Sequence, residues 1–464
     1  MATLVMKPRS DNKPCGSAIE SALKKVGSGL QYDKIFFRRG IYPVDISLDC
    51  INSGSTISAE DGAVIKLIDD APKDVFKPMM PVFGQAKENI ANALVENLTF
   101  EGNGKNQLVL AGDGFHNFLW FQNATNIEVK NIKIRDSKGD GLRVTNGSKI
   151  FFHDNNIYRC GHDGFYCDGG MGIEAWNNKI NLRTNSGLRL RGVINGYLHD
   201  NEITNELGWE ASSPGSQIEN SRGKKSSNIL IKNNLFKGMN GPGVWAIGVG
   251  NTDPSAASGL TLQGNIFENC GRMKKEHKIS CVGGFVGDGW DKVLIENCTF
   301  DNCKGYAIAF GNYRGAASGK GYTALVRRNI ITNTSPSAYQ GVASGAPIAN
   351  LINAKYSVTA EENCLFNNKT GAYSVESTGE ILEDPHYVDS LNSDYRLCDD
   401  SPCVFADYEL GRYAGTPREK PKLLPSVVIP KQTEEELLAY VQTLKAAGFI
   451  LETDKISFLN MGSN

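Results

Sequence analysis

Short apolar segments that alternate with polar residues recur along most of the chain. Between about residues 90 and 400 these segments are only a few residues long, and glycine and asparagine gather at their ends. Alternation with a period of two is typical of strands, and glycine and asparagine are typical of tight turns. Helical periodicity is missing from this region, so the pattern predicts an all-β protein built from many short strands.

Asparagine followed by an apolar residue returns at nearly regular intervals. The repeats begin at Asn131, Asn155, Asn177, Asn201, Asn233, Asn265, Asn297, Asn329 and Asn363. Spacings of about 22–24 residues at first and about 31–34 later are typical of a solenoid. We expect a right-handed single-stranded parallel β-helix, with one circuit per repeat and asparagines stacked at a turn, where their amides bond along the stack.

The two ends of the chain differ from this repeat. A short amphipathic helix is predicted from Ser17, where it caps the open end of the core, and residues 1–90 hold this cap and the first circuits. Residues 91–415 form the main β-helix with a substrate groove. Residues 416–464 begin with four prolines, which predict an extended arm, and continue with a short C-terminal helix suited to an oligomer contact.

The order of the capping helix, RRGIYPV, GSTISAEDG and a late DPHYVDSLNSDYRLCDDSPC resembles a known group. It is similar to right-handed β-helix proteins of the pectate-lyase-like superfamily, which includes phage tailspike depolymerases, polysaccharide lyases and hydrolases, and the disaggregatase of methanogens. The resemblance implies a polysaccharide partner and, by analogy with tailspikes, a homo-oligomer, with a trimer favoured. It says little about chemistry, because fold does not fix function.

Charge and hydropathy exclude several other functions. The 49 basic residues are balanced by 51 acidic ones, giving a net charge of −2, which argues against a nucleic-acid partner. No apolar run approaches the ~18–20 residues of a membrane-spanning helix, so no membrane insertion is expected. The N-terminus has no secretory signal peptide. An extracellular location, secreted or on a virion surface, is the expectation that the resemblance brings.

The eleven cysteines are odd in number and cannot all pair within one chain. Cys270, Cys298 and Cys364 each end an ENC triplet, which predicts small core side chains rather than a disulfide framework. Cys398 and Cys403 are the best placed for a local disulfide. No spacing is typical of zinc, and no metal site is predicted.

Alignment of successive circuits by their glycines predicts a polar face. The inward positions are Leu142, Phe165, Leu188, Ile218, Val244 and Phe285. Outward neighbours form one column of Arg143, Tyr166, Arg189, Glu219 and Trp245, and a second of Asp168, Arg191 and Asp288. Asp140 lies one circuit before Asp163. Exposed aromatic rings flanked by arginines and acids are typical of a sugar-binding groove.

The acids of this face favour glycoside hydrolysis by two carboxylates. Asp163 and Asp168 are the first catalytic candidates, followed by Glu219 and Asp140, and their circuits are close enough for either stereochemical outcome. The alternative for Asp140 and Asp163 is a purely structural role in their Asp-Gly turns. Substrate-binding candidates are Arg143, His162, Tyr166, Arg189, Arg191, Trp209, Glu210 and Trp245.

Elimination at a uronic acid is the competing chemistry. It needs a cation for the sugar carboxylate, which Arg143, Arg189 or Arg191 can supply, and a base, which His162 or Tyr166 can supply. No cofactor is required, although calcium would fit clustered turn carboxylates. A third interpretation is a non-catalytic carbohydrate-binding or structural spike. Trp209 and Glu210 lie on a long loop expected to wall the groove, and Glu210 is an alternative acid.

Overall fold

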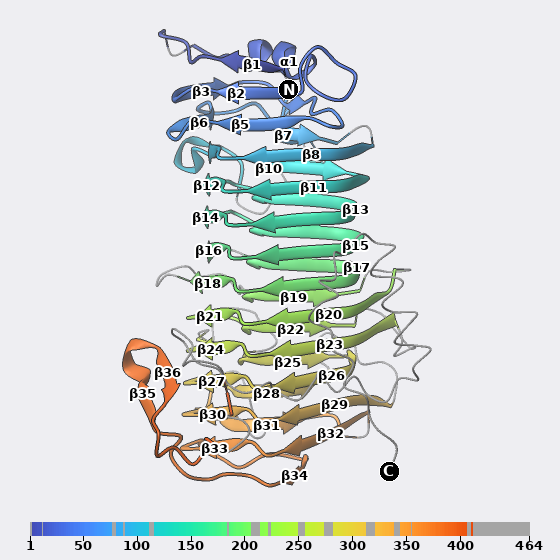
Figure 1. The fold of residues 1–464 in the computed structure, drawn as a ribbon. Coiled ribbons are helices and arrows are strands. Elements are labelled where there is room, and N and C mark those ends of the chain that lie inside the picture. The colour runs from blue at the N-terminus through green and yellow to red at the C-terminus, as the bar shows by residue number, and fades with distance from the viewer. Residues whose placement is uncertain are drawn as a thin grey trace. The chain divides into compact units, whose positions relative to one another are not determined.

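The computed structural model describes residues 2–411, except 12, 77–79, 87–88, 111–115, 183–184, 206–213, 221–223, 249–255, 273–281, 312–320, 338–343, 354 and 406–409. Residues 1–417 form one compact unit, in which parallel strands stack along a single axis (Figure 1). The arm and helix expected over 416–464 lie outside the described residues. No helix in the described part is long and apolar enough to cross a membrane.

Each circuit of the chain contributes strands to three faces of this stack. The first face contains β4 (Leu48–Asp49), β7 (Pro81–Gln85), β10 (Asn117–Gln122), β19 (Ser216–Glu219), β22 (Val244–Ile247), β25 (Phe285–Asp288), β28 (Tyr306–Gly311) and β31 (Ala346–Asn350). Three long strands, β13 (Leu142–His153), β15 (Phe165–Trp176) and β17 (Leu188–His199), begin on this face and end on the second. Their first halves therefore carry the predicted site.

The second and third faces complete the circuits. The second contains β1 (Thr3–Met6), β2 (Lys34–Phe37), β5 (Thr56–Ala59), β8 (Ile90–Glu96), β11 (Ala124–Lys130), β20 (Ser226–Lys232), β23 (Ala257–Gln263), β26 (Asp291–Glu296), β29 (Tyr322–Arg327), β32 (Tyr356–Glu361) and β34 (Glu376–Thr378). The third, a 12-stranded sheet, contains β3 (Gly40–Val44), β6 (Ala63–Leu67), β9 (Thr99–Glu101), β12 (Lys133–Arg135), β14 (Asn156–Tyr158), β16 (Lys179–Leu182), β18 (Glu202–Asn205), β21 (Leu235–Lys237), β24 (Ile266–Glu268), β27 (Thr299–Asp301), β30 (Ile330–Thr332) and β33 (Cys364–Phe366).

The predicted cap is present, since helix α1 (Gly16–Leu23) buries Ile19 and Leu23 against the first circuits. Two 3-10 turns, η1 (Gly104–Asn106) and η3 (Ser390–Asn392), occur in connections. Near the end of the described chain, β35 (Tyr387–Asp389) and β36 (Asp394–Leu397) form an antiparallel hairpin beside the last circuits (Figure 1). This hairpin is the late segment on which the family resemblance partly rests.

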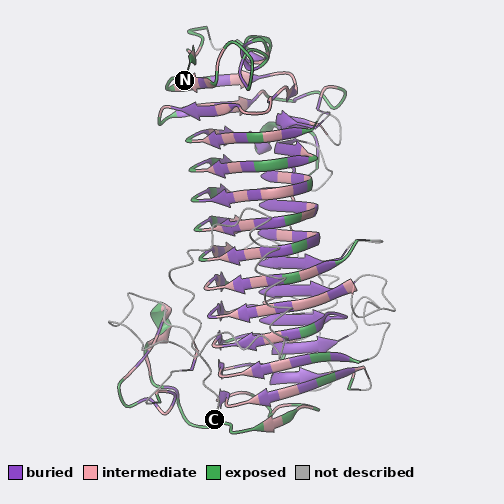
Figure 2. Ribbon diagram, turned by 45° about the vertical axis from the view of Figure 1, so that its right-hand side comes forward, coloured by how far each residue is buried: buried purple, intermediate pink, exposed green. Residues whose placement is uncertain are grey.

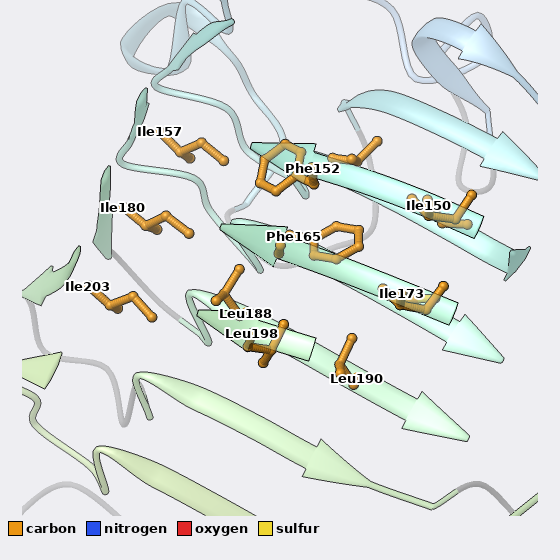
Figure 3. Packing of buried hydrophobic residues seen from close by; sticks show 14 of the residues in the cluster. Ile150, Phe152, Ile157, Phe165, Ile173, Ile180, Leu188, Leu190, Leu198 and Ile203 are labelled. Atoms are coloured by element: carbon orange, nitrogen blue, oxygen red, sulfur yellow. The ribbon is translucent and has the colours of Figure 1, made fainter. Parts of the chain in front are cut away.

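The core is a set of apolar columns that run through the circuits. Ile157, Ile180 and Ile203 stack from strand to strand, and the rings of Phe152 and Phe165 lie 5.0 Å apart (Figure 3). On the second face, as in β8 and β20, buried residues alternate with more exposed ones, whereas first-face strands such as β19 and β22 are buried at every position (Figure 2). Burial of these columns gives the hydrophobic free energy that closes each circuit.

A buried asparagine ladder holds the circuits in register, as the sequence predicts. The side-chain Nδ2 of Asn178 donates to Oδ1 of Asn201 at 2.8 Å, and Asn201 donates likewise to Asn234. Some repeats were placed one residue early, because Asn177 and Asn233 precede the ladder positions and adopt positive φ at the turn. The ladder itself comprises Asn155, Asn178, Asn201, Asn234, Asn265, Cys298, Asn329 and Asn363.

The cysteine predictions hold in part. Cys270, Cys298 and Cys364 are buried free thiols, and Cys298 takes an asparagine's place in the ladder. The predicted disulfide between Cys398 and Cys403 is not formed in this structure, where both are free thiols. Cys403 instead packs into a small apolar cluster with Cys364, whereas Cys398 is only half-buried.

Candidate functional site

Outward side chains of the first face form a column in which rings and cations alternate. Strand register places side by side Trp120, Arg143, Tyr166, Arg189, Gln217 and Trp245. Because neighbouring strands are about 4.8 Å apart, each guanidinium in the column can lie over the ring of the next circuit. The structure therefore brings together four of the five predicted members and adds Trp120, which the sequence alignment had left one circuit outside.

The fifth predicted member, Glu219, belongs to the second column. Gln217 pairs with Arg189, and Glu219 pairs with Arg191, so this circuit is displaced by two residues from the predicted alignment. Ile218 is buried as expected but lies at the next inward position along the strand. The second column therefore runs Thr145, Asp168, Arg191, Glu219, Ile247 and Asp288.

Asp140 and Asp163 are buried where β13 and β15 begin, and both bond the backbone of the next circuit. Oδ1 of Asp140 accepts from the amide N–H of Asp163 at 3.0 Å, and Oδ1 of Asp163 accepts from that of Ser186 at 2.9 Å. Asn117 occupies the same position one circuit earlier and accepts from the amide of Asp140. The structural role left open for these aspartates is therefore real, and both side chains are fully buried.

His162 lies between these two carboxylates. Its Nδ1 is 2.6 Å from Oδ1 of Asp140 and 3.2 Å from Oδ2 of Asp163. On the other side of the ring, Nδ2 of Asn185 lies 3.3 Å from Nε2 and also donates to Asp163 at 2.8 Å. Because that amide nitrogen donates, a neutral His162 with its proton on Nδ1 keeps Nε2 as a proton acceptor.

Burial and charge act in opposite directions on this cluster. Burial alone would lower the pKa of His162, but the hydrogen bond to Asp140 and the charges of Asp163 and Asp140 outweigh it and raise that pKa. For Asp163, burial raises the pKa, and the positive charges of His162 and Arg189 offset only part of this. Both pKa shifts favour the protonated form of the group concerned.

Arg189 connects the cluster to the second column, because it contacts both Asp163 and Glu219. Arg189 donates from Nε and Nη2 to Oε1 of Glu219 at 2.9 and 2.6 Å, and Arg191 donates to both oxygens of Asp168 at 3.1 and 3.0 Å. Arg143 is held less firmly, by a single 3.4 Å contact between Nη1 and Oδ2 of Asp140. Asp140 therefore joins Arg143 and His162 through its two oxygens.

The aromatic rings of the first column are buried, contrary to the prediction that they are exposed. Tyr166 and Trp245 are 3% and 4% exposed. Tyr166 lies between the guanidinium groups of Arg143, at 4.8 Å, and Arg189, at 4.7 Å, because these side chains from the adjacent circuits cover its two faces. Burial also raises the pKa of its hydroxyl. Tyr166 therefore orients arginines and offers no face to a sugar.

Among the described residues, one cluster places side chains that can ligate a metal ion close together. One ligand atom from each of Asp140, His162 and Asp163 lies within 4.8 Å of the others. Calcium, however, takes six to eight oxygen ligands, whereas Arg143 and Arg189 already face the outer oxygens of these carboxylates. The donor set does not fit calcium.

Two predicted residues, Trp209 and Glu210, fall within 206–213 and lie outside the described residues. Sequence reasoning missed Asn185 and Gln217. The Pro-Gly pairs at 214–215 and 242–243 were the available signal for Gln217, since each immediately precedes a strand of the first face.

Comparisons with known proteins agree with this architecture. Residues 226–404 match the family described as disaggregatase related, and residues 117–272 match the right-handed β-helix region. No curated protein sequence matches the chain.

Three solved structures share the fold at low identity. The A-module of the mannuronan C-5 epimerase AlgE6 of Azotobacter vinelandii is 15% identical, with a TM-score of 0.56, covering 80% of this chain and 96% of that one. Pre-mature gene product 12 of bacteriophage phi29 is 14% identical, TM-score 0.55, over 80% of this chain and 49% of its own. The catalytic domain of a GH87 α-1,3-glucanase, in complex with nigerose, is 14% identical, with a TM-score of 0.53. The match covers 82% of this chain and 68% of that domain. The chain is thus a right-handed parallel β-helix protein.

Proposed function

We propose that the protein cleaves an acidic polysaccharide by β-elimination, with His162 as the base and Arg143 as the cation that binds the sugar carboxylate. The observation that carries this proposal is the shared partner: Asp140 contacts Nδ1 of His162 with one oxygen and Arg143 with the other. A base and a carboxylate-binding cation are thereby held side by side, which is what elimination next to a carboxylate requires.

The exposure of the ion pairs supports an anionic substrate. Arg143 is 21% exposed and Asp140 only 1%, while His162 is 28% exposed and Asp163 is 0%. The same order holds for Arg191 over Asp168, at 36% and 16%, and for Arg189 over Glu219, at 14% and 7%. In each pair the cation is nearer to solvent, so a substrate at this face meets positive charge first, although the pairs are electrically balanced.

The proposed reaction moves one proton and one electron pair. Nε2 of His162 accepts the proton on the carbon next to the sugar carboxylate, while Arg143 stabilises the negative charge that develops on that carboxylate. The electron pair forms a carbon–carbon double bond, and the glycosidic C–O bond breaks at the neighbouring carbon. The departing oxygen takes a proton, which His162 is positioned to return. The products are an unsaturated uronate and a new reducing end.

The structure offers less support for Tyr166 as the base. Its hydroxyl has a raised pKa, and its ring is enclosed by arginines. The similarity to a mannuronan epimerase module and to a glucanase domain supports a polysaccharide substrate without choosing the reaction.

Hydrolysis remains a second candidate, with Asp168 paired with Glu219 rather than with Asp163, the partner that the sequence placed first. Asp140 and Asp163 are buried and saturated, whereas Asp168 and Glu219 lie two circuits apart in the second column. Two strand spacings place their backbones about 9.6 Å apart, close to the upper limit for inverting enzymes.

The first experiment is incubation with alginate, polygalacturonate, hyaluronan and chondroitin, alongside neutral dextran and xylan. Elimination gives reducing ends together with the ultraviolet absorbance of an unsaturated uronate. Reducing ends without that absorbance would replace elimination by hydrolysis at Asp168 and Glu219. No cleavage of any polymer, with binding retained, would leave a recognition protein.

A matched pair of polymers and variants sharpens this test. The cleaved polymer is treated with carbodiimide and borohydride, which convert its carboxylates to neutral alcohols, and we expect the treated polymer to resist cleavage. Arg143→Gln is expected to lower kcat/KM by about 10²-fold, the order of loss when one charge-stabilising donor is removed. Arg328→Gln is the control, because Arg328 is 26% exposed and binds Glu362 away from this face. Equal losses in both variants would contradict the role of Arg143.

A further inference from the structure

Two pairs of buried cysteines are close neighbours. All ten cysteines among the described residues are free; Cys270 and Cys303 occupy the same position on consecutive circuits, and Cys364 and Cys403 share one small buried cluster. The first pair joins consecutive circuits already tied by backbone hydrogen bonds, such as Lys304 N–H to the carbonyl of Cys270. The second pair joins parts of the chain that are 39 positions apart (403 − 364).

Cys364 and Cys403 sit where the C-terminal segment docks on the last circuits. Cys364 begins β33, and Cys403 follows the β35–β36 hairpin. Both are fully buried in a small apolar cluster. The other members are Ile330 from the β-helix and Leu397 and Leu410 from the docked segment. The cluster is separate from the main core, and the hydroxyl of Tyr395, which donates to Asp301 at 3.1 Å, also attaches this segment to the earlier circuits.

We propose that Cys364 and Cys403 form a disulfide when the chain folds in an oxidising environment. This disulfide attaches the C-terminal segment covalently to the β-helix. Two thiols lose two protons and two electrons and form one S–S bond. With glutathione disulfide as the oxidant, those electrons and protons yield two molecules of reduced glutathione. The bridge closes a long loop, which is the geometry in which a cross-link most restricts the unfolded chain.

Cys398 is a poorer partner for Cys403. It is only half-buried, and its amide donates to the carbonyl of His386, in the connection before β35. Cys403 instead shares its buried cluster with Cys364.

Burial of the Cys364 and Cys403 thiols determines the stage of folding at which the disulfide can form. The neighbouring Cys403 thiol and burial together raise the pKa of Cys364, so little of this thiol is present as thiolate. Both residues are also shielded from solvent. We therefore expect oxidation while the segment docks during folding, and slow oxidation once the reduced protein is folded.

The test is a peptide map under non-reducing conditions. The full chain is unfolded with reductant and refolded either in glutathione disulfide with reduced glutathione or in reductant alone, then alkylated and digested. The oxidised sample is expected to contain a peptide that links residues 364 and 403, and to melt about 2–5 °C higher than the reduced one. Glutathione disulfide added to the folded, reduced chain should give little of that peptide.

Variants separate this bridge from the alternatives. Cys398→Ser should keep both the linked peptide and the melting shift, whereas Cys403→Ala should lose both. Cys303→Ala removes a buried thiol of the other pair and should leave the 364–403 peptide unchanged. A peptide linking 398 with 403, or complete alkylation of Cys364 and Cys403 after oxidative refolding, would overturn the proposal.

Discussion

The strands β13, β15 and β17 carry two histidine arrangements, one near their start on the first face and one at their end on the second. His162 lies between Asp140 and Asp163, which are fully buried. His199, at the end of β17, lies between Glu174 at 3.1 Å and Asp200 at 2.7 Å, and these acids are 21% and 50% exposed. The two histidines thus have similar partners and very different surroundings.

The comparison shows that burial of the acids, rather than the histidine–carboxylate contact, distinguishes the candidate site. On the second face, His153 and His199 stack on either face of Trp176, with ring centroids 3.9 and 5.8 Å away, and this ladder is a packed surface. On the first face, the histidine is partly exposed and lies between two fully buried acids. Buried acids that shift the pKa of a histidine within reach of solvent are typical of catalytic sites.

The largest expected effect comes from substituting each of the two histidines by glutamine and comparing the cleavage rates. His162→Gln should lower kcat/KM by roughly 10²–10⁴-fold, the range for loss of a general base. His199→Gln should change the rate less than about twofold, because the second face takes no part. Initial rates of uronate absorbance measure both. Similar losses in the two variants would mean that the comparison has no functional meaning.

A smaller effect is expected when His162 is retained but the negative charge of its partner Asp140 is removed. Asp140→Asn removes two influences that raise the pKa of His162, while burial still lowers it. The pKa should fall, so the rising limb of the pH–rate profile should move to lower pH, with the maximal rate reduced by roughly 10-fold to 10²-fold. A lower rate with an unmoved profile would assign Asp140 to structure alone.

Tyr166 tests whether the ring or the hydroxyl matters. Tyr166→Phe retains the ring between Arg143 and Arg189 and should keep activity within about twofold. Tyr166→Leu removes these cation–π contacts, each worth about 0.5–2 kcal/mol, and should lower kcat/KM by about 10-fold. A large loss in the phenylalanine variant would instead restore Tyr166 as a proton-transferring residue.

The smallest effect belongs to the second face and concerns stability. Partial burial would raise the pKa of Asp154, but hydrogen bonds from His153 and Asn177 outweigh it and lower that pKa. A carboxylate with a lowered folded-state pKa contributes stability above its ordinary value of 3.8, and this stability is lost as pH falls through the folded-state pKa.

Asp154→Asn should therefore cost at most about 1 kcal/mol at neutral pH, because the side chain is partly exposed. Urea unfolding of both proteins at pH 7 and in strong acid measures this cost, and the difference should shrink in acid. A difference that persists in acid would have a packing origin. Cleavage at neutral pH should not change.

Much of the fold follows from the sequence because each circuit repeats the same local pattern. The asparagine ladder, the capping helix and the apolar columns depend on spacing and alternation, which are visible in one chain. Register failed at Glu219, where the connection between β17 and β19 lengthens and a two-residue shift preserves the same alternation of inward and outward positions.

The site was less predictable, because contacts between circuits set its properties. The sequence brings Asp140, His162 and Asp163 to one face, but it does not show that both acids are fully buried while His162 is partly exposed. Nor does it show that Tyr166 is covered by Arg143 and Arg189, since both come from neighbouring circuits. Exposure decided which groups can reach a substrate, and exposure depends on those neighbours.

The most direct measurement is an NMR titration of the ring protons of His162, assigned by comparison with His162→Gln. The account predicts a pKa above the ordinary value of 6.5 in the native protein and a lower one in Asp140→Asn. A native pKa at or below 6.5, unchanged in Asp140→Asn, would contradict the central claim that the buried aspartates prepare His162 for proton transfer.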